Sequence, residues 1–197
     1  MMQNSPESED LRIKRTRKLI QEAFIELTVE KGFAALTVRD ITKRAMINRS
    51  TFYRHYLDKY DLLDKFIAEV FEQTAGHGTD QLAEEESLPG PVLLMRHIRD
   101  HKEFYKVMFG DRGDPKFIER FRQNTERRIR GWAQNIDMPG APPFELRVKY
   151  AAHAGIGAIL WWLEQGQEIS PEQLARWLSR IHRGYLDPMA KTPIAND

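Results

Sequence analysis

The segment NRSTFYRHYLDKYDLL, residues 48–63, interleaves basic and aromatic side chains in a chain whose formal net charge is only +1. Arginine and lysine donate hydrogen bonds to phosphate oxygens, and arginine also makes bidentate contacts with the edge of a guanine base. Tyrosine, histidine, serine and threonine supply further donors for phosphates. This combination is typical of a surface that contacts a polyanion. The side chains assigned to that surface are Arg39, Arg49, Ser50, Thr51, Tyr53, His55 and Lys59.

Individual side chains in this set suit different contacts. Arg49 suits a guanine edge, and Thr51 offers both a methyl group and a hydroxyl group. Phosphate oxygens, which position a protein without reading sequence, suit Tyr53, His55 and Lys59, while Arg39 suits either kind of target. Two alternatives stay open from the residues alone. Tyr53 can instead be a core residue, and Arg54 is interpreted as a solvated side chain.

Charge is distributed unevenly along the chain. Residues 11–59 contain twelve Lys and Arg against five Asp and Glu, which gives this part a net charge of +7 and leaves −6 for the remainder. A basic head on a mildly acidic body suits a polyanionic partner for the head alone. On charge alone, a solvated basic surface with no partner is an equally good interpretation.

Three helices are predicted to position the basic segment. Ile20, Ala23, Phe24 and Leu27 repeat at helical spacing, which predicts a first helix over residues 12–31 that ends at a left-handed Gly32. Thr37, with Asp40 three residues on, resembles a capping box and predicts a second helix over 38–45. Asn48 or Ser50 then caps a third helix over 49–56, which buries Phe52 and Tyr56 against Ile41 and Ile47.

Two short helices joined by a tight turn form a helix-turn-helix, whose second helix enters the major groove of DNA. The stretch GFAALTVRDITKRAMINRSTFYRHYLDKYDLLDKF, residues 32–66, resembles the DNA-binding domain of TetR-family transcriptional regulators. The resemblance implies that the seven side chains named above occupy DNA-contacting positions. Met46 departs from the family, which usually has glycine in the turn. It must accept a positive φ, at a cost of about 1 kcal/mol, or the turn must differ.

The remaining sequence predicts further helices and no strand. A long helix from residue 58 or 59 to 74 is followed by helices near 92–101, 102–109, 115–136, 144–165 and 171–185. With the first three, this gives an all-α fold of about nine helices, as the family has. The predicted divisions are an N-terminal tail (1–11), a helix-turn-helix domain (12–58), a helical regulatory and dimerisation domain (59–187) and a C-terminal tail (188–197).

The last two predicted helices have the composition of an interface. Small residues allow close helix approach, and large aromatic residues follow them. In family members, two such helices from each subunit form a four-helix dimer core, and this end of the chain resembles one C-terminal subgroup. Completing a monomeric core is the alternative. The predicted interface residues are Ala154, Gly157, Ala158, Trp161, Trp162, Leu174, Trp177, Leu178 and Ile181.

Aromatic residues in the body are candidates to line an apolar cavity, the place where inducers bind in many relatives. Close-packed core is the alternative for each of them. His97 and His101, at i and i+4, have a spacing that suits a helical metal site, but no third or fourth ligand is identifiable, so no metal is expected. The candidate ligand-binding residues are Phe104, Tyr105, Phe109, Phe121, Trp132 and Tyr150.

Several classes of protein are excluded by missing motifs. The sequence has no HExxH pair, no phosphate-binding glycine loop, no G-x-S-x-G elbow and no cysteine, so we expect neither an enzyme nor a cofactor. It has no apolar run typical of a signal peptide, and its most apolar stretch, residues 151–163, is shorter than the roughly 20 residues that span a bilayer. A cytoplasmic protein without membrane contact is expected.

The resulting hypothesis is a homodimeric regulator that binds double-stranded DNA. It is expected to repress palindromic operators until an unknown effector binds the body, and a small apolar molecule is the candidate effector. The alternative is a TetR-like regulator that acts mainly through a protein partner, as a co-activator or anti-repressor.

Overall fold

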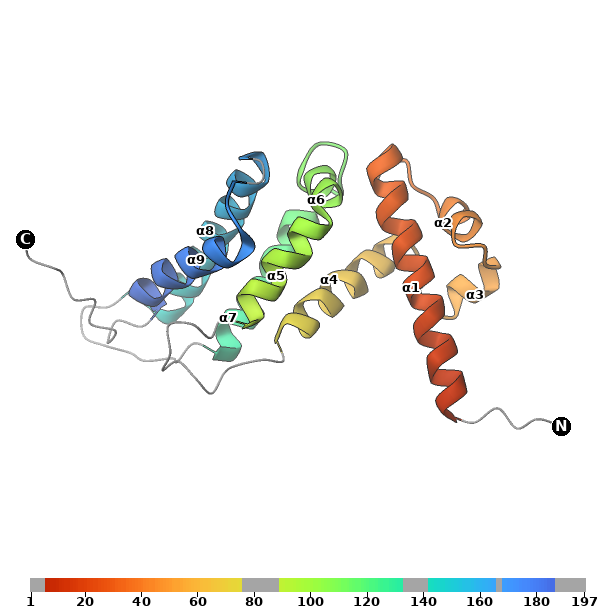
Figure 1. The fold of residues 1–197 in the computed structure, drawn as a ribbon, viewed down its shortest axis with the longest axis horizontal. Coiled ribbons are helices and arrows are strands. Elements are labelled where there is room, and N and C mark those ends of the chain that lie inside the picture. Colours follow the sequence, from red (N-terminus) through yellow and green to blue (C-terminus); the bar gives the residue numbers. More distant parts are fainter. Residues whose placement is uncertain (1–5, 76–88, 133–141, 166–167, 187–197) are drawn as a thin grey trace, which may run out of the picture. The chain divides into compact units, whose positions relative to one another are not determined.

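The computed structural model of the chain describes residues 6–75, 89–132, 142–165 and 168–186, and within them it confirms an all-α fold (Figure 1). Every regular element in these ranges is a helix, and their number agrees with the predicted nine. None of the described helices is long and apolar enough to cross a membrane. The helices are α1 (Pro6–Lys31), α2 (Val38–Arg44), α3 (Arg49–Tyr53), α4 (Lys59–Ala75), α5 (Pro89–Asp100), α6 (Lys102–Phe109), α7 (Phe117–Trp132), α8 (Phe144–Glu164) and α9 (Pro171–Leu186).

The chain divides into two compact units that interleave along the sequence. The first unit comprises Met1–Phe66 and Glu103–Phe117, and the second comprises Ile67–Lys102 and Ile118–Asp197. Helix α4 therefore contributes residues to both units, and almost all of α6 belongs with the N-terminal helices.

Aromatic packing explains why α6 belongs to the first unit. Phe24 of α1 is fully buried, and its ring meets the rings of Phe33, Phe66 and Phe104 edge-on at centroid distances of 6.2, 6.0 and 5.6 Å. Such edge-to-face pairs add about 0.5–1.5 kcal/mol each beyond their area burial. Phe104 thus anchors α6 in the core that α1 and the start of α4 form.

The predicted helix boundaries around the helix-turn-helix are largely confirmed. Gly32 has φ +82° and ends α1, with its N–H donating to Thr28 O at 2.9 Å. Thr37 caps α2 through the expected reciprocal box, in which Asp40 N donates to Thr37 Oγ1 and Thr37 N donates to Asp40 Oδ2. Helix α3 ends at Tyr53, three residues before the predicted end, although Tyr56 is still buried.

Met46 occupies the turn between α2 and α3 with φ 52°. Of the two outcomes expected from the sequence, a positive φ at Met46 or a different turn, the structure shows the positive φ. Its side chain is 89% exposed, which leaves little packing to offset the strain of a left-handed conformation.

We therefore expect Met46→Gly to raise the free energy of unfolding by about 1 kcal/mol, equivalent to roughly 2–4 °C in Tm for a chain of this size. Met46→Ala is the control, because alanine removes the same exposed side chain but keeps the strain. Thermal denaturation followed by circular dichroism would measure both. A glycine variant no more stable than the alanine variant would show that the turn is unstrained.

The second unit is built around α8, whose buried face includes Val148, Ala151, Ala152 and Ile156. Helix α9 packs against both α8 and α5. At the start of α9, Ser170 Oγ accepts a hydrogen bond from Gln173 N at 3.1 Å, so Ser170 caps this helix just before Pro171.

Helix α7 begins later than predicted. It starts at Phe117 and not at Pro115, because the main chain at Asp114 closes a tight turn in which Phe117 N donates to Asp114 O at 2.8 Å.

Candidate nucleic-acid interface

Helix α3 presents an exposed row of polar side chains over a buried anchor. Phe52 is fully buried, whereas Arg49, Ser50 and Tyr53 are exposed. Tyr53 is 54% exposed, and its ring is perpendicular to the Phe52 ring at a centroid distance of 5.6 Å. Tyr53 is therefore not a core residue.

Thr51 is held in place by Arg54, a residue for which the sequence favours a solvated side chain. Arg54 Nη2 donates to Thr51 Oγ1 at 3.1 Å, and both side chains lie at the exposed end of α3. The i, i+3 spacing of the two residues is the sequence signal for this pair. The bond orients the Thr51 hydroxyl and brings a further cation to the row.

His55 lies partly buried just beyond α3. Burial, followed by the positive charges of Arg17, Arg54 and Lys65, lowers the pKa of His55 below its usual value. The neutral imidazole is thus favoured, and it offers one N–H to an acceptor and no charge. The same charges show that cations from α1, α3 and α4 converge around this ring.

Lys59, at the start of α4, is predicted to contact a phosphate, but in the structure its ammonium group is bound by backbone carbonyl oxygens. Its Nζ donates to the carbonyl oxygens of Phe33, Ala34 and Leu36 at 2.9, 3.0 and 2.9 Å. It also lies 4.8 Å from the centre of the Phe33 ring. An ammonium group has three protons, so these three carbonyls match its whole donor capacity. In this structure Lys59 stabilises the connection between α1 and α2 through hydrogen bonds to its backbone.

The same connection is also held from the loop after α6. Phe33 N donates to Arg112 O at 2.9 Å, and Arg112 Nη2 donates to Glu30 O at 3.0 Å. A Cβ on Gly32 would lie 3.0 Å from Arg112 O, so the residue with no side chain permits this close approach. Arg112 is some 80 residues away in sequence, and no local pattern predicts its role.

Helix α2 is fixed on α1 by charge pairs that leave Arg39 available. Arg44 donates to Glu26 and to both carboxylate oxygens of Glu30 at 2.8–2.9 Å, and the hydrogen bond from Arg44 lowers the pKa of Glu30. Lys31 pairs with Asp40 at 3.1 Å. Arg39 is exposed. Arg44 is consequently a structural cation, whereas Arg39, the other arginine of α2, is exposed outside these ion pairs.

The candidate ligand-binding residues that the structure describes have different surroundings. Phe104 and Tyr105 are almost fully buried in the first unit, where Tyr105 stacks on Phe109 at 6.2 Å. Phe121 is buried in the second unit against Phe71, at 5.0 Å. Tyr150 is 52% exposed, and the side chain of Trp132 lies outside the described residues. Close packing, the alternative, describes Phe104, Tyr105 and Phe121.

The predicted interface residues divide into three groups by their burial. Trp162 and Leu174 are buried inside the second unit, and Trp162 Nε1 donates to Ile169 O at 2.8 Å. These two belong to the subunit core. Ala158 and Leu178 are half-buried. The exposed members on α8 and α9 are Ala154, Gly157, Trp161, Trp177 and Ile181.

The rings of His97 and His101 lie close together. Their rings are 4.6 Å apart between centroids. In the part of the chain that the structure describes, no group of three or more His, Cys, Asp or Glu side chains is arranged to hold a metal ion.

Comparison with known proteins gives matches along most of the chain. Residues 20–66 match the family described as bacterial regulatory proteins, tetR family, and residues 85–184 match the family described as transcriptional regulator C-terminal region. The uncharacterized HTH-type transcriptional regulator YxbF of Bacillus subtilis is 28% identical over 173 residues, which are 85% of this chain and 44% of that protein. DhaS of Lactococcus lactis, an HTH-type dhaKLM operon transcriptional activator, is 28% identical over 94 residues, 48% of this chain and 49% of that protein. The chain thus spans about half the length of the curated relatives it matches.

Solved structures agree with these matches. A TetR transcriptional regulator from Streptococcus agalactiae superimposes with a TM-score of 0.60 at 26% identity, covering 90% of this chain and 99% of that one. The dihydroxyacetone kinase operon activator DhaS superimposes with a TM-score of 0.63 at 20% identity, covering 87% of this chain and 96% of that one. A likeness at this identity supports the fold alone.

Proposed function

Because the chain belongs to the TetR family of bacterial transcriptional regulators, a family of non-enzymatic DNA-binding proteins, we propose that it binds a palindromic operator as a homodimer. In this proposal it represses transcription in the cytoplasm until an effector binds the second unit. The division into a DNA-binding domain (12–58) and a regulatory and dimerisation domain (59–187) is part of the same proposal.

The observation that carries the proposal is the exposed row on α3. Arg49, Ser50 and Tyr53 are exposed while Phe52 between them is fully buried, so the helix is anchored by one face and free on the other. That arrangement is what a recognition helix needs to enter a major groove. In the proposal Arg49 contacts a base edge, Tyr53 and His55 contact phosphates, and Arg39 lies within reach of either.

Dimerisation is supported by the exposed apolar side chains of α8 and α9. Trp161, Trp177 and Ile181 are 44%, 40% and 51% exposed. Exposed tryptophans on adjacent helices are typical of an interface centre, where such residues carry most of the binding energy. A two-fold dimer would place two recognition helices about 34–36 Å apart, one DNA turn, which is the reason to expect a palindrome.

The proposed switch acts through α4, which begins at Lys59 and continues to Ala75 in the second unit. An effector that moves this helix by a few ångströms would change the separation of the two DNA-binding units. Since both must fit consecutive major grooves, operator affinity would fall.

Activation of transcription, which the partner-dependent alternative includes, is the second candidate, and the relation to DhaS favours activation because that protein is an activator by name. A reporter gene under the bound promoter would separate the two, since deletion of the regulator raises expression if it represses and lowers it if it activates.

The test of operator binding is a measurement on Arg49→Ala. Candidate operators come from footprinting the region upstream of the protein's own gene. We expect the variant to bind the operator about 10- to 100-fold more weakly in fluorescence anisotropy, and to lose its preference at one base pair of each half-site, because a bidentate arginine contact discriminates by roughly 1–3 kcal/mol.

Arg127→Ala serves as the control, since Arg127 is an exposed arginine of α7 in the second unit. An equal loss of affinity for operator and random DNA by Arg49→Ala would refute the base contact. Absence of any operator binding by the wild-type protein at low salt would refute the proposal in favour of the partner-dependent one.

A further inference from the structure

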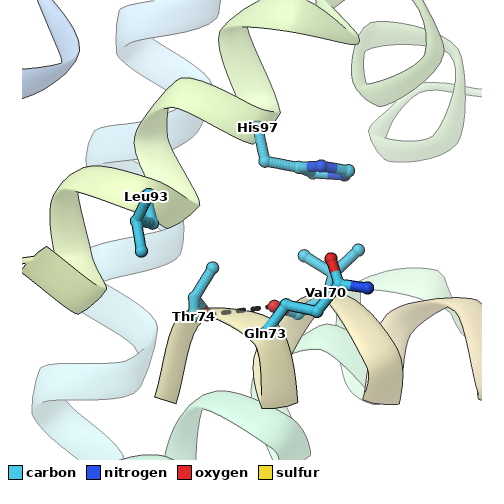
Figure 2. A pocket seen from close by; sticks show the side chains of 5 residues that line it. All are labelled: Val70, Gln73, Thr74, Leu93 and His97. Atoms are coloured by element: carbon cyan, nitrogen blue, oxygen red, sulfur yellow. Dashed lines mark hydrogen bonds between the residues drawn. The ribbon is translucent and has the colours of Figure 1, made fainter. Parts of the chain in front are cut away.

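A pocket of about 230 Å³ lies between α4 and α5 in the second unit (Figure 2). Val70, Gln73 and Thr74 line it from α4, and Leu93 and His97 line it from α5. The two sets recur at helical spacing, so one face of each helix forms a wall. None of the aromatic residues expected to line a cavity is among them.

Arg128 of α7 lies at the Thr74 end of this pocket. Its Nη1 donates to Thr74 Oγ1 at 3.1 Å. Gly90, one turn before Leu93 on the same face of α5, lies against both groups, because a Cβ there would be 2.5 Å from Arg128 Nη2 and 2.6 Å from Thr74 O. The lack of a side chain at Gly90 is what allows the guanidinium to lie between α4 and α5.

The guanidinium of Arg128 differs from those of Arg122 and Arg130 on the same helix in its counter-charge. Arg122 pairs with Glu119 and Glu126, and Arg130 pairs with Glu126 and Glu145. Among the residues that the structure describes, Arg128 forms no ion pair, and burial lowers its pKa. Within the described part of the chain, the guanidinium of Arg128 has five N–H donors but makes a side-chain hydrogen bond only to the Thr74 hydroxyl.

A partly buried cation without a counter-ion is unfavourable, because burial removes part of the water that would otherwise solvate it. An anion that reached Arg128 through the neighbouring pocket would restore both the charge balance and the hydrogen bonds. The pocket thus has apolar walls at Val70 and Leu93 and polar groups at Gln73 and His97, and a cation lies beyond Thr74.

We propose that the pocket between α4 and α5 binds a small organic carboxylate, with its carboxylate group near Arg128 and its apolar part between Val70 and Leu93. This inference rests on the proposed function of the second unit as the effector-binding part. A carboxylate carries one negative charge and matches the planar guanidinium, whereas a phosphate brings more charge than one arginine balances. The pocket is below the roughly 300–1,000 Å³ typical of drug-sized ligands, so the ligand has few heavy atoms.

His97 is assigned the role of a neutral hydrogen-bonding group in this site. Burial, together with the neighbouring charge of His101, lowers the pKa of His97 to about 4, so its ring is uncharged at neutral pH. Figure 2 shows the ring of His97 extending over Val70 and Gln73. It therefore borders the end of the pocket away from Thr74 and adds no second positive charge.

The test compares acids with amides of the same shape. Benzoate and benzamide, and butyrate and butyramide, are titrated into the full-length protein by isothermal calorimetry at pH 7. We expect at least one acid to bind about tenfold or more tightly than its amide. Arg128→Met, which keeps the volume but removes the charge, should abolish that preference, and Arg127→Met on the exposed side of α7 should retain it.

A second variant keeps the test decisive if Arg128→Met fails to fold. Leu93→Trp fills the pocket and leaves Arg128 in place, so it should weaken acid binding severalfold or more. Acids that bind no better than their amides in both pairs, or acid binding that survives in Leu93→Trp, would overturn the inference. Operator affinity is measured separately by anisotropy. If the acid binds but leaves operator affinity unchanged, the carboxylate site stands and the effector part of the proposed function fails.

Discussion

Replacing Lys59 by methionine is expected to lower the free energy of unfolding by about 2–4 kcal/mol. The substitution removes the donor from the carbonyl oxygens of Phe33, Ala34 and Leu36, and hydrogen bonds to a charged group contribute roughly 1.5–3 kcal/mol each. Ala34 is exposed, so water replaces part of what is lost there. The methionine stem still fills the space beside the Phe33 ring, which keeps the loss from including a cavity.

The consequence for DNA binding separates two roles of the lysine. If Lys59 positions the α1–α2 connection, Lys59→Met should lower operator affinity while the slope of log K against log salt stays unchanged. If Lys59 instead contacts a phosphate, as its sequence position predicts, the slope should fall by about one per subunit. Urea denaturation and anisotropy at several salt concentrations measure the two quantities.

Lys43→Met is the matched control for stability, because Lys43 is an exposed lysine of α2 and its replacement should change the free energy of unfolding by less than about 0.5 kcal/mol. Lys59→Arg is the conservative variant. Its flat guanidinium retains the charge but does not place three protons on the same three carbonyls, so only partial recovery of stability is expected. Full stability in Lys59→Met would show that the three hydrogen bonds are dispensable.

The sequence was sufficient to predict elements whose determinants are local. The glycine at position 32 and the Thr37–Asp40 box each involve residues within a few positions, and both are found in the structure. The left-handed Met46 also follows from local turn chemistry. The start of the first helix was predicted less accurately. Helix α1 begins at Pro6, six residues before the predicted start, because proline tolerates the first turn of a helix even where no apolar stripe marks it.

Long-range contacts were beyond the sequence patterns. Lys59 meets carbonyls 23–26 positions away, and Arg112 meets Glu30 82 positions away, so no periodicity links them. Of the paired tryptophans on α8, Trp161 is exposed and Trp162 is buried. Small residues occur on both faces of α8, so its apolar pattern does not distinguish the two sides. The Arg128 site depends on three helices and had no sequence signal.

Replacing Gly157 by arginine is expected to convert the proposed dimer into a folded monomer. A Cβ at Gly157 meets nothing within 4 Å, so the subunit accommodates a side chain at this exposed position of α8. Replacing a glycine inside a helix is, if anything, favourable to the helix itself. In a dimer that pairs α8 and α9, however, the same arginine would be forced into the close helix contact and would be desolvated there.

Gly131→Arg provides a control of the same chemistry. Gly131 is also exposed, lies near the end of α7 and has nothing within 4 Å of a Cβ, but it is outside the predicted interface. Sedimentation velocity at micromolar concentration should show Gly157→Arg as a monomer and Gly131→Arg as wild type. Circular dichroism should show both variants folded.

Operator affinity should fall much further in Gly157→Arg than in any single contact variant. A dimer binds its second half-site at the high effective concentration set by the first, an advantage of about 10²- to 10⁴-fold that a monomer does not have. Affinity for random DNA should change far less, since each subunit keeps its basic surface. A Gly157→Arg protein that stays dimeric and binds the operator as tightly as Gly131→Arg would place the dimer contact elsewhere than the exposed face of α8 and α9. That result would also remove the reason to expect recognition helices one DNA turn apart.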